Sequence, residues 1–276
     1  MRQIQCPQKH FRAKGAFFMY LSYRKVAVLT VLMGLALAAG GAFYWYQQAI
    51  YTASLDTRPL KVGIVGEIDT LQPAQLDSPE ERLLASALYE GLVAYDERTS
   101  SIKPRLARSW KYSADHKTLV VELKKVNFSN GQPLTAEKVK AAWEKSFSTT
   151  KDWANISLFL PIEGSQARLE GRTPTIAGLE AVDSNTLRIR LEKPNSAFLH
   201  MLTNPIFWVY DEAETTDPSP GTGPFILQAS TEDHTIVMTR NEKYHQGPPR
   251  LSALQFALYA EPYQAFGDFK INKLDY

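Results

Sequence analysis

The chain contains very little cysteine and no residue pattern that is typical of catalysis or metal binding. Cys6 is the only cysteine in 276 residues, so the remainder of the chain can form no disulfide and no thiolate zinc site. The five histidines show no i, i+4 pair and no metal-ligand spacing. A G-x-S-x-G motif is missing, and Gly221-Thr-Gly-Pro224 lacks the lysine of a phosphate loop. We therefore expect no catalytic residue, no metal site and no cofactor, and a protein that is not an enzyme.

Acidic residues are absent from the first 55 positions, which hold six basic side chains. These are Arg2, Lys9, Arg12, Lys14, Arg24 and Lys25. The whole chain has 31 basic and 29 acidic residues, so the part after residue 55 has 25 against 29 and is slightly acidic. It also lacks a basic stripe, and clustered positive charge is what nucleic-acid binding requires. We therefore expect no nucleic acid among the partners.

Charge of either sign is absent from Val26–Tyr46, a run of 21 residues. A helix of that length spans the hydrocarbon of a bilayer, which is about 30 Å thick. The run ends in Phe43-Tyr-Trp-Tyr46, whose rings favour the membrane–water interface, and the preceding basic residues favour a cytoplasmic N-terminus. We predict a cytoplasmic tail over 1–25, a transmembrane helix over 26–46, a linker over 47–59 and an extracytoplasmic body over 60–276.

Two other interpretations of the apolar run remain open. Ala36-Leu-Ala38 fits the small-x-small rule of a cleaved signal peptide, and a start at Met19 would give that peptide a typical length. A buried helix of a soluble domain is the third interpretation. The transmembrane helix and the signal peptide would both export the body. The first gives a single-pass membrane protein, and the second gives a secreted or periplasmic protein.

Helical and strand patterns interleave along the body, which indicates an α/β or mixed α+β fold. Ser78-Pro-Glu-Glu81 has the form of a capping box with proline at the first helical position. Thr135 precedes a helix whose apolar face is Val139, Ala142, Trp143 and Phe147. We also expect Asn195 to cap a short helix that runs through Met201. The expected strands are 60–65, 118–124, 178–182, 186–191, 206–210, 225–229, 235–240 and 251–259.

Five short phrases follow in a fixed order between residues 89 and 244. They are Tyr89-Glu-Gly-Leu-Val93, Pro104-Arg-Leu-Ala-Arg-Ser-Trp110, Phe128-Ser-Asn-Gly-Gln-Pro-Leu-Thr-Ala-Glu-Lys-Val139, Gly221-Thr-Gly-Pro-Phe225 and Asn241-Glu-Lys-Tyr244. Thr70-Leu-Gln-Pro73 precedes them, and Ile271-Asn-Lys-Leu-Asp-Tyr276 follows. Over roughly Leu60–Tyr276 the order resembles the peptide-, dipeptide- and nickel-binding proteins of bacterial ABC importers, extracellular solute-binding protein family 5.

The resemblance implies a lobe of the periplasmic-binding-protein type II kind and a clamp that closes on its ligand by hinge motion. It implies an oligopeptide or another small solute as ligand, such as a nickel chelate or a sugar, and ABC permease subunits as partners. Two segments match positions that contact the ligand in the family. The first, Asp77, Ser78 and Pro79, would offer backbone groups to an extended peptide. The second is Trp153, an aromatic wall that we expect in an irregular stretch.

Length is the main departure from the family, whose members are nearly twice as long. The portion that would supply the second lobe, with the acidic residue that pairs with a peptide's amino terminus, has no counterpart in this sequence. We therefore expect the N-terminal lobe of a peptide-binding protein. The alternative is a membrane-anchored interaction or sensor module, or an inactive fragment, derived from the same family.

Overall fold

Strand β1 (Leu60–Val65) opens the folded body by pairing in parallel with a strand near the other end of the chain, β10 (Ala253–Tyr259). The computed structural model describes residues 32–34, 36–46, 58–214, 216–230 and 234–276. The chain divides into two units, Met1–Ser54 and Leu55–Tyr276.

In the first unit, residues 32–34 and 36–46 are helical. The predicted transmembrane segment 26–46 is therefore described only in part, and the cytoplasmic tail 1–25 and most of the linker lie outside the described residues. Among the residues with a described conformation, no helix has both the length and the apolar character needed to cross a membrane.

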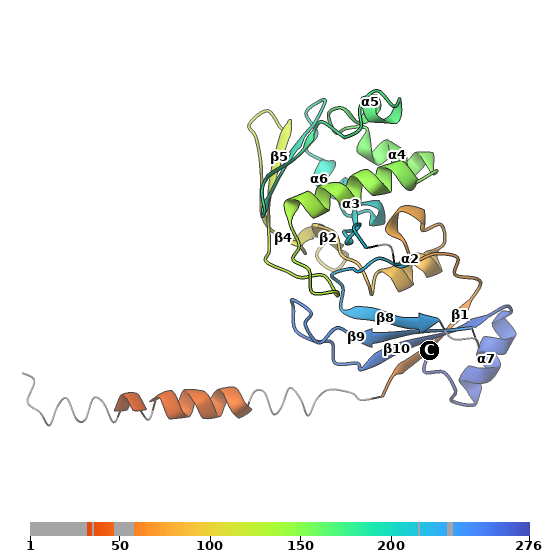
Figure 1. Ribbon diagram of the computed structural model, residues 1–276. Coiled ribbons are helices and arrows are strands. Elements are labelled where there is room, and N and C mark those ends of the chain that lie inside the picture. The colour runs from red at the N-terminus through yellow and green to blue at the C-terminus, as the bar shows by residue number, and fades with distance from the viewer. Residues whose placement is uncertain (1–31, 35, 47–57, 215, 231–233) are drawn as a thin grey trace, which may run out of the picture. The chain divides into compact units, whose positions relative to one another are not determined.

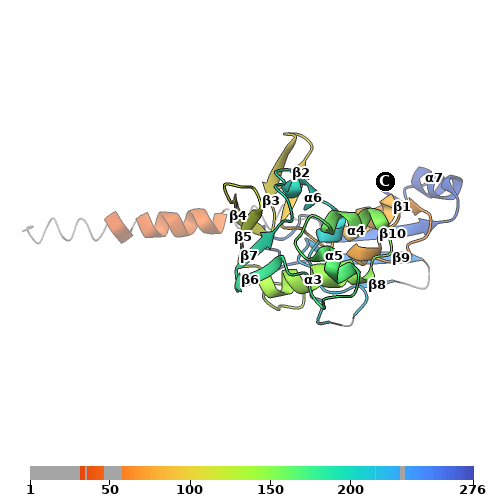
Figure 2. The same ribbon diagram turned by 90° about the horizontal axis from the view of Figure 1, so that it is seen from above.

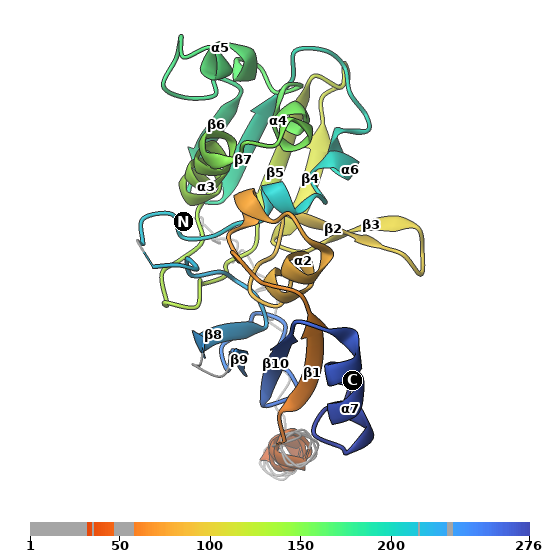
Figure 3. The ribbon, with the colours of Figure 1, turned by 90° about the vertical axis from the view of Figure 1, so that its right-hand side faces the viewer.

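In the second unit, one four-stranded sheet has the order β1-β10-β9-β8. Strands β8 (Phe225–Ser230) and β9 (Thr235–Arg240) form an antiparallel hairpin, and β9 pairs antiparallel with β10. Helix α7 (Pro262–Lys270) packs against β1 and β10 (Figure 3). At the outer edge of β1, the Tyr276 N–H donates to the Lys61 carbonyl and the Gly63 N–H donates to the Tyr276 carbonyl. This is the pattern of a parallel ladder, so the last residue extends the sheet.

The second four-stranded sheet is antiparallel, with the order β4-β5-β7-β6. Its strands are β4 (Ala107–Tyr112), β5 (Thr118–Leu123), β6 (Leu179–Asp183) and β7 (Thr186–Arg190). Helix α3 (Ala136–Thr149) packs against β6 and β7 (Figure 2). The face of α3 predicted from the sequence is buried, because β5 and β7 turn alternate apolar side chains toward it.

The remaining elements lie outside the two sheets. Strands β2 (Val93–Asp96) and β3 (Ser101–Pro104) form a separate hairpin. The helices are η1 (Pro73–Gln75), α2 (Pro79–Ala85), α4 (Trp153–Phe159), α5 (Ser165–Leu169), α6 (Phe198–Met201) and η2 (Pro205–Phe207). Of these, α4 and α5 lie on the far side of α3 from the first sheet (Figure 1). The mixed α/β class expected from the sequence is confirmed.

An aromatic cluster in the second unit explains why the strand predicted over 206–210 is only partly present: Val209 and Tyr210 form isolated β-bridges, but the residues before them do not. Pro205–Phe207 is a 3-10 helix, which the Asn204 side chain caps by accepting from the Ile206 N–H. Phe207 is fully buried against Trp143 and Phe159, and its carbonyl accepts the indole N–H of Trp143 at 2.9 Å. This burial selects the turn, which the apolar run alone could not reveal. The short helix α6 is present, but its N-cap is Ala197 and not Asn195.

Candidate ligand-binding site

The segment between β1 and α2 is folded around one buried carboxylate, that of Glu81. It accepts hydrogen bonds from the backbone N–H groups of Asp69 and Thr70 at 3.1 and 3.2 Å, and from those of Asp77 and Ser78 at 2.8 and 3.2 Å. The Ser78 hydroxyl in turn accepts from the Glu81 N–H. This is the predicted capping box, extended to a second stretch of backbone.

Two opposing effects act on the Glu81 carboxyl. Burial raises its pKa because it disfavours the charged form, but the four backbone N–H donors favour that form more strongly. The net result is a pKa below the ordinary value. Glu81 is therefore a negatively charged clasp that joins residues 69–70 to residues 77–78.

A polar cavity of about 690 Å³ opens beside this clasp. Its lining comes from the segment around Glu81 and from the end of α3 with the residues that follow it. The lining residues are Asp69, Thr70, Ala74, Gln75, Asp77, Glu81, Thr149, Thr150, Lys151 and Asp152. Four of them carry carboxylates and one is a lysine, so the cavity suits a polar ligand that carries positive charge. The Thr150 hydroxyl is buried and has no hydrogen-bond partner among the described residues.

The structure brings the two predicted contact segments to the same place. Asp77 lines the cavity, and Trp153 directly follows Asp152, another lining residue. Trp153 is 62% exposed, which leaves its indole free to cover a ligand. The stretch around it is not irregular as predicted, because the Asp152 side chain caps α4 and Trp153 is the first residue of that helix.

Ser78 and Pro79 lie behind the lining, as the N-cap and first residue of α2. The N–H groups of Asp77 and Ser78 are already engaged by Glu81, and proline has none. A ligand would therefore meet the Asp77 carboxylate and backbone carbonyls, which accept more than one bond.

Sequence reasoning missed Thr149, Thr150 and Lys151. They follow the apolar face of α3 without any pattern of their own, and only the end of that helix carries them to the cavity.

Several of the ordered phrases meet at a second buried carboxylate, Glu90. It accepts the Tyr244 hydroxyl at 2.7 Å, lies 2.7 Å from His245 Nε2, and accepts the Thr222 hydroxyl at 3.4 Å. Burial and the neighbouring Glu90 raise the pKa of Tyr244, so its hydroxyl keeps the proton that it donates. These contacts tie the end of the α2 segment to the β8–β9 hairpin.

The glycines of the Gly221-Thr-Gly phrase serve the same packing. A Cβ on Gly223 would lie 2.5 Å from the Leu88 carbonyl carbon, and the Gly223 N–H donates to the Leu88 carbonyl at 2.9 Å. Close backbone approach, rather than phosphate binding, accounts for them. Within the described ranges, no group of three or more His, Cys, Asp or Glu residues could hold a metal ion.

The α/β fold and its open polar cavity are consistent with a protein of the solute-binding class, and the family match establishes that class. The chain belongs to the bacterial extracellular solute-binding proteins, family 5, because residues 101–276 match the family model "Bacterial extracellular solute-binding proteins, family 5 Middle". The resemblance inferred from the ordered phrases is thereby confirmed.

Curated relatives support the same assignment. A "Putative binding protein" of Haemophilus influenzae is 31% identical over 182 residues, which are 65% of this chain and 35% of that protein. The periplasmic murein peptide-binding protein MppA of Escherichia coli is 29% identical, over 66% of this chain and 36% of its own length. The dipeptide-binding protein DppE of Bacillus subtilis is 26% identical, over 63% of this chain and 34% of its own length. The matches thus span about a third of the length of these relatives.

Solved structures share the fold. The Escherichia coli murein tripeptide binding protein MppA superimposes with a TM-score of 0.72 at 25% identity, over 80% of this chain and 46% of that one. NikA from Staphylococcus aureus, in complex with Ni(L-His)2, superimposes with a TM-score of 0.64 at 23% identity, over 79% of this chain and 43% of that one. At that identity the likeness is evidence of the fold alone.

Proposed function

We propose that this chain forms one wall of a peptide-binding site in an extracytoplasmic solute-binding protein that serves an ABC importer. The observation that carries the proposal is the polar cavity beside the Glu81 clasp, which Asp77 and Asp152 line, with the exposed Trp153 next to Asp152 in the chain. Relatives named as dipeptide- and murein peptide-binding proteins support the ligand class. Asp77 would meet a cationic group of the ligand, Trp153 would cover an apolar part, and Ser78 and Pro79 would hold the wall in shape.

Peptide titration of the chain tests this proposal. We expect a mixture of tri- to pentapeptides to bind with a dissociation constant on the order of 1 mM, about −4 kcal/mol, because one wall leaves much of the ligand in water. Trp153→Ala should weaken binding about two- to tenfold, the range of one aromatic contact. Tyr263→Ala is the matched control, since that ring is 71% exposed on α7, outside the cavity lining. Binding that is unchanged by Trp153→Ala, or no binding at about 10 mM peptide, would refute the proposal.

A second candidate function is a membrane-anchored interaction module that docks a permease or sensor. The exposed apolar side chains of α7 and the following residues favour it: Tyr263, Phe266, Phe269 and Ile271 are 71%, 58%, 47% and 62% exposed. Patches of this kind often mark contact sites. Co-purification of a permease with the wild-type chain, but not with Phe266→Ser, would support this function. Retention of the permease by Phe266→Ser would count against it.

We further propose that residues 26–46 hold the protein at the cytoplasmic membrane with the body outside. The support lies in the sequence, which has 21 uncharged residues preceded by six basic ones. Membrane fractionation and N-terminal sequencing of the chain expressed in bacteria distinguish this from a cleaved signal peptide. Cleavage after Ala38 would contradict the proposal that residues 26–46 anchor the protein, but it would agree with export of the body.

A further inference from the structure

Strand β8 is the last strand of its sheet, and part of its outer edge is unpaired. The Asn241 N–H donates to the Pro224 carbonyl at 2.7 Å, so residues 224 and 241 form a hydrogen-bonded pair. Because such pairs alternate in an antiparallel ladder, the backbone groups of Phe225 and Leu227 point away from β9. The Phe225 N–H does so and reaches the Ala87 carbonyl. For the outward N–H and carbonyl of Leu227, the described part of the chain provides no backbone partner.

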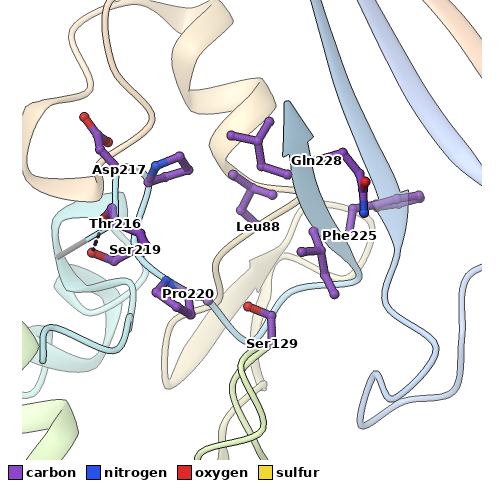
Figure 4. A pocket seen from close by; sticks show the side chains of 12 residues that line it. Leu88, Ser129, Thr216, Asp217, Ser219, Pro220, Phe225 and Gln228 are labelled. Atoms are coloured by element: carbon purple, nitrogen blue, oxygen red, sulfur yellow. Dashed lines mark hydrogen bonds between the residues drawn. The ribbon is translucent and has the colours of Figure 1, made fainter. Parts of the chain in front are cut away.

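A groove of about 310 Å³ runs along this edge. Residues 216–221 form the opposite wall and Leu88 lies between the two walls (Figure 4). The wall is held in place from both sides: the Tyr89 hydroxyl donates to the Ser219 carbonyl at 2.9 Å, and Gln72 Nε2 donates to the Ser219 hydroxyl at 3.3 Å. The groove shares no lining residue with the polar cavity beside Glu81.

The chemistry of the groove selects its occupant. One side offers a strand edge with a free N–H and a free carbonyl, which is complementary to an extended backbone. Asp217 is the one charged residue in the lining, and the other polar side chains are those of Ser129, Thr216, Ser219 and Gln228. Pro218 and Pro220 contribute no N–H to the opposite wall. An extended backbone can therefore pair with β8 while a basic side chain meets Asp217.

We propose that this groove is a second peptide site, in which a short extended peptide with a basic side chain adds to the edge of β8. The volume lies at the lower end of the roughly 300–1,000 Å³ typical of ligand pockets. The free edge before the β-bulge at residues 227–229 is also short. The site therefore takes a few residues and not a folded partner. This inference goes beyond the proposed function and does not depend on the polar cavity.

Nuclear magnetic resonance of the full chain with a capped tripeptide, acetyl-Ala-Lys-Ala-amide, tests the site. We expect the Leu227 amide to shift and to become protected from hydrogen exchange on binding. The Ile226 amide, which already faces β9, should keep its protection. A peptide N-methylated at its backbone amides should not bind, because it cannot complete the ladder.

Replacement of the Asp217 charge tests its role. Asp217 is exposed, and from the described residues it accepts one long hydrogen bond, from Gln72 at 3.4 Å. Asp217→Asn should weaken binding of the lysine peptide about two- to fivefold, as for an exposed ion pair. Asp217→Lys should reverse the preference toward acetyl-Ala-Glu-Ala-amide. Melting curves establish that both variants are folded.

Trp153→Ala serves as the control for the other site and should leave these shifts unchanged. If Trp153→Ala abolishes them, the peptide binds in the polar cavity and the groove proposal is wrong, while the proposed function stands. If the Leu227 amide does not respond at millimolar peptide, or Asp217→Lys fails to reverse the preference, the groove is not a peptide site.

Discussion

Glu81 shows how much structure a single residue can organise. Its carboxylate fixes backbone on both sides of η1 and begins α2. The proposed peptide site would gain from this rigidity, because a wall that is already ordered loses less entropy when the ligand binds.

Replacement of Glu81 tests this role. Glu81→Gln has nearly the same shape but no charge, so the buried N–H groups lose charge-assisted partners. We expect the free energy of unfolding to fall by about 1–3 kcal/mol, measured by urea denaturation at pH 7. Glu80→Gln, one position earlier on the same turn and without these bonds, is the control and should change it little.

The acid dependence of this stability has a definite sign. The pKa of Glu81 in the folded protein lies below its ordinary value of 4.5, so the unfolded chain takes up the proton first. The stabilisation by Glu81 is complete above that value and is lost as the pH falls through the lower folded pKa. The stability difference between wild type and Glu81→Gln should therefore narrow below about pH 4.5. A constant difference from pH 7 to pH 3 would contradict the assigned role.

At the scale of elements, local signals predicted some of the structure, missed β2, β3 and β4 among others, and could not reveal the long-range contacts. The capping box of α2, the buried face of α3 and the β8–β9 hairpin were predictable, because each depends on neighbours in sequence. The parallel pairing of β1 with β10 depends on residues at opposite ends of the body, and no local pattern specifies it.

The residues of the candidate site also fall into a group that the sequence predicted and a group that it did not. Asp77 and Trp153 were identified through the family resemblance, whereas Thr149, Thr150 and Lys151 reach the cavity only because α3 ends there. Helix α7 was missed: it buries none of its residues fully, and its large apolar side chains are exposed, so it does not follow the pattern of a helix that packs its apolar face into the core.

Two glycines test the packing of elements against each other. Gly223→Ala would place a Cβ against the Leu88 backbone, which cannot move without disturbing the end of the α2 segment. We expect a loss of about 1–3 kcal/mol or more, as for overpacking. Gly267→Ala in α7 is the matched control, because its Cβ would meet nothing within 4 Å, and helix propensity predicts a gain of about 0.5–1 kcal/mol. Thermal unfolding should show a melting temperature below that of the wild type for Gly223→Ala and above it for Gly267→Ala. Equal melting temperatures of the two variants would disprove this account.

At the scale of the whole molecule, α7 adds an apolar patch to the surface of the body. Phe266 and Phe269 expose 58% and 47% of their surface, and Lys270 lies over the Phe266 ring at 4.5 Å. We expect the isolated body to associate weakly with itself at high concentration, because exposed apolar surface is removed from water on contact. Sedimentation velocity should show this association, and Phe266→Ser should reduce it. Association that Phe266→Ser leaves unchanged would place the contact elsewhere.

The pairing of Tyr276 with the outer edge of β1 has a mechanical consequence. Arg58 lies just before β1 in the described chain, and Tyr276 runs parallel to that strand. A pulling force applied between Arg58 and Tyr276 would slide the two segments along each other and load their hydrogen bonds together instead of one after another. The body should therefore resist stretching along this axis better than a pull across the sheet, a difference that single-molecule force measurements can resolve.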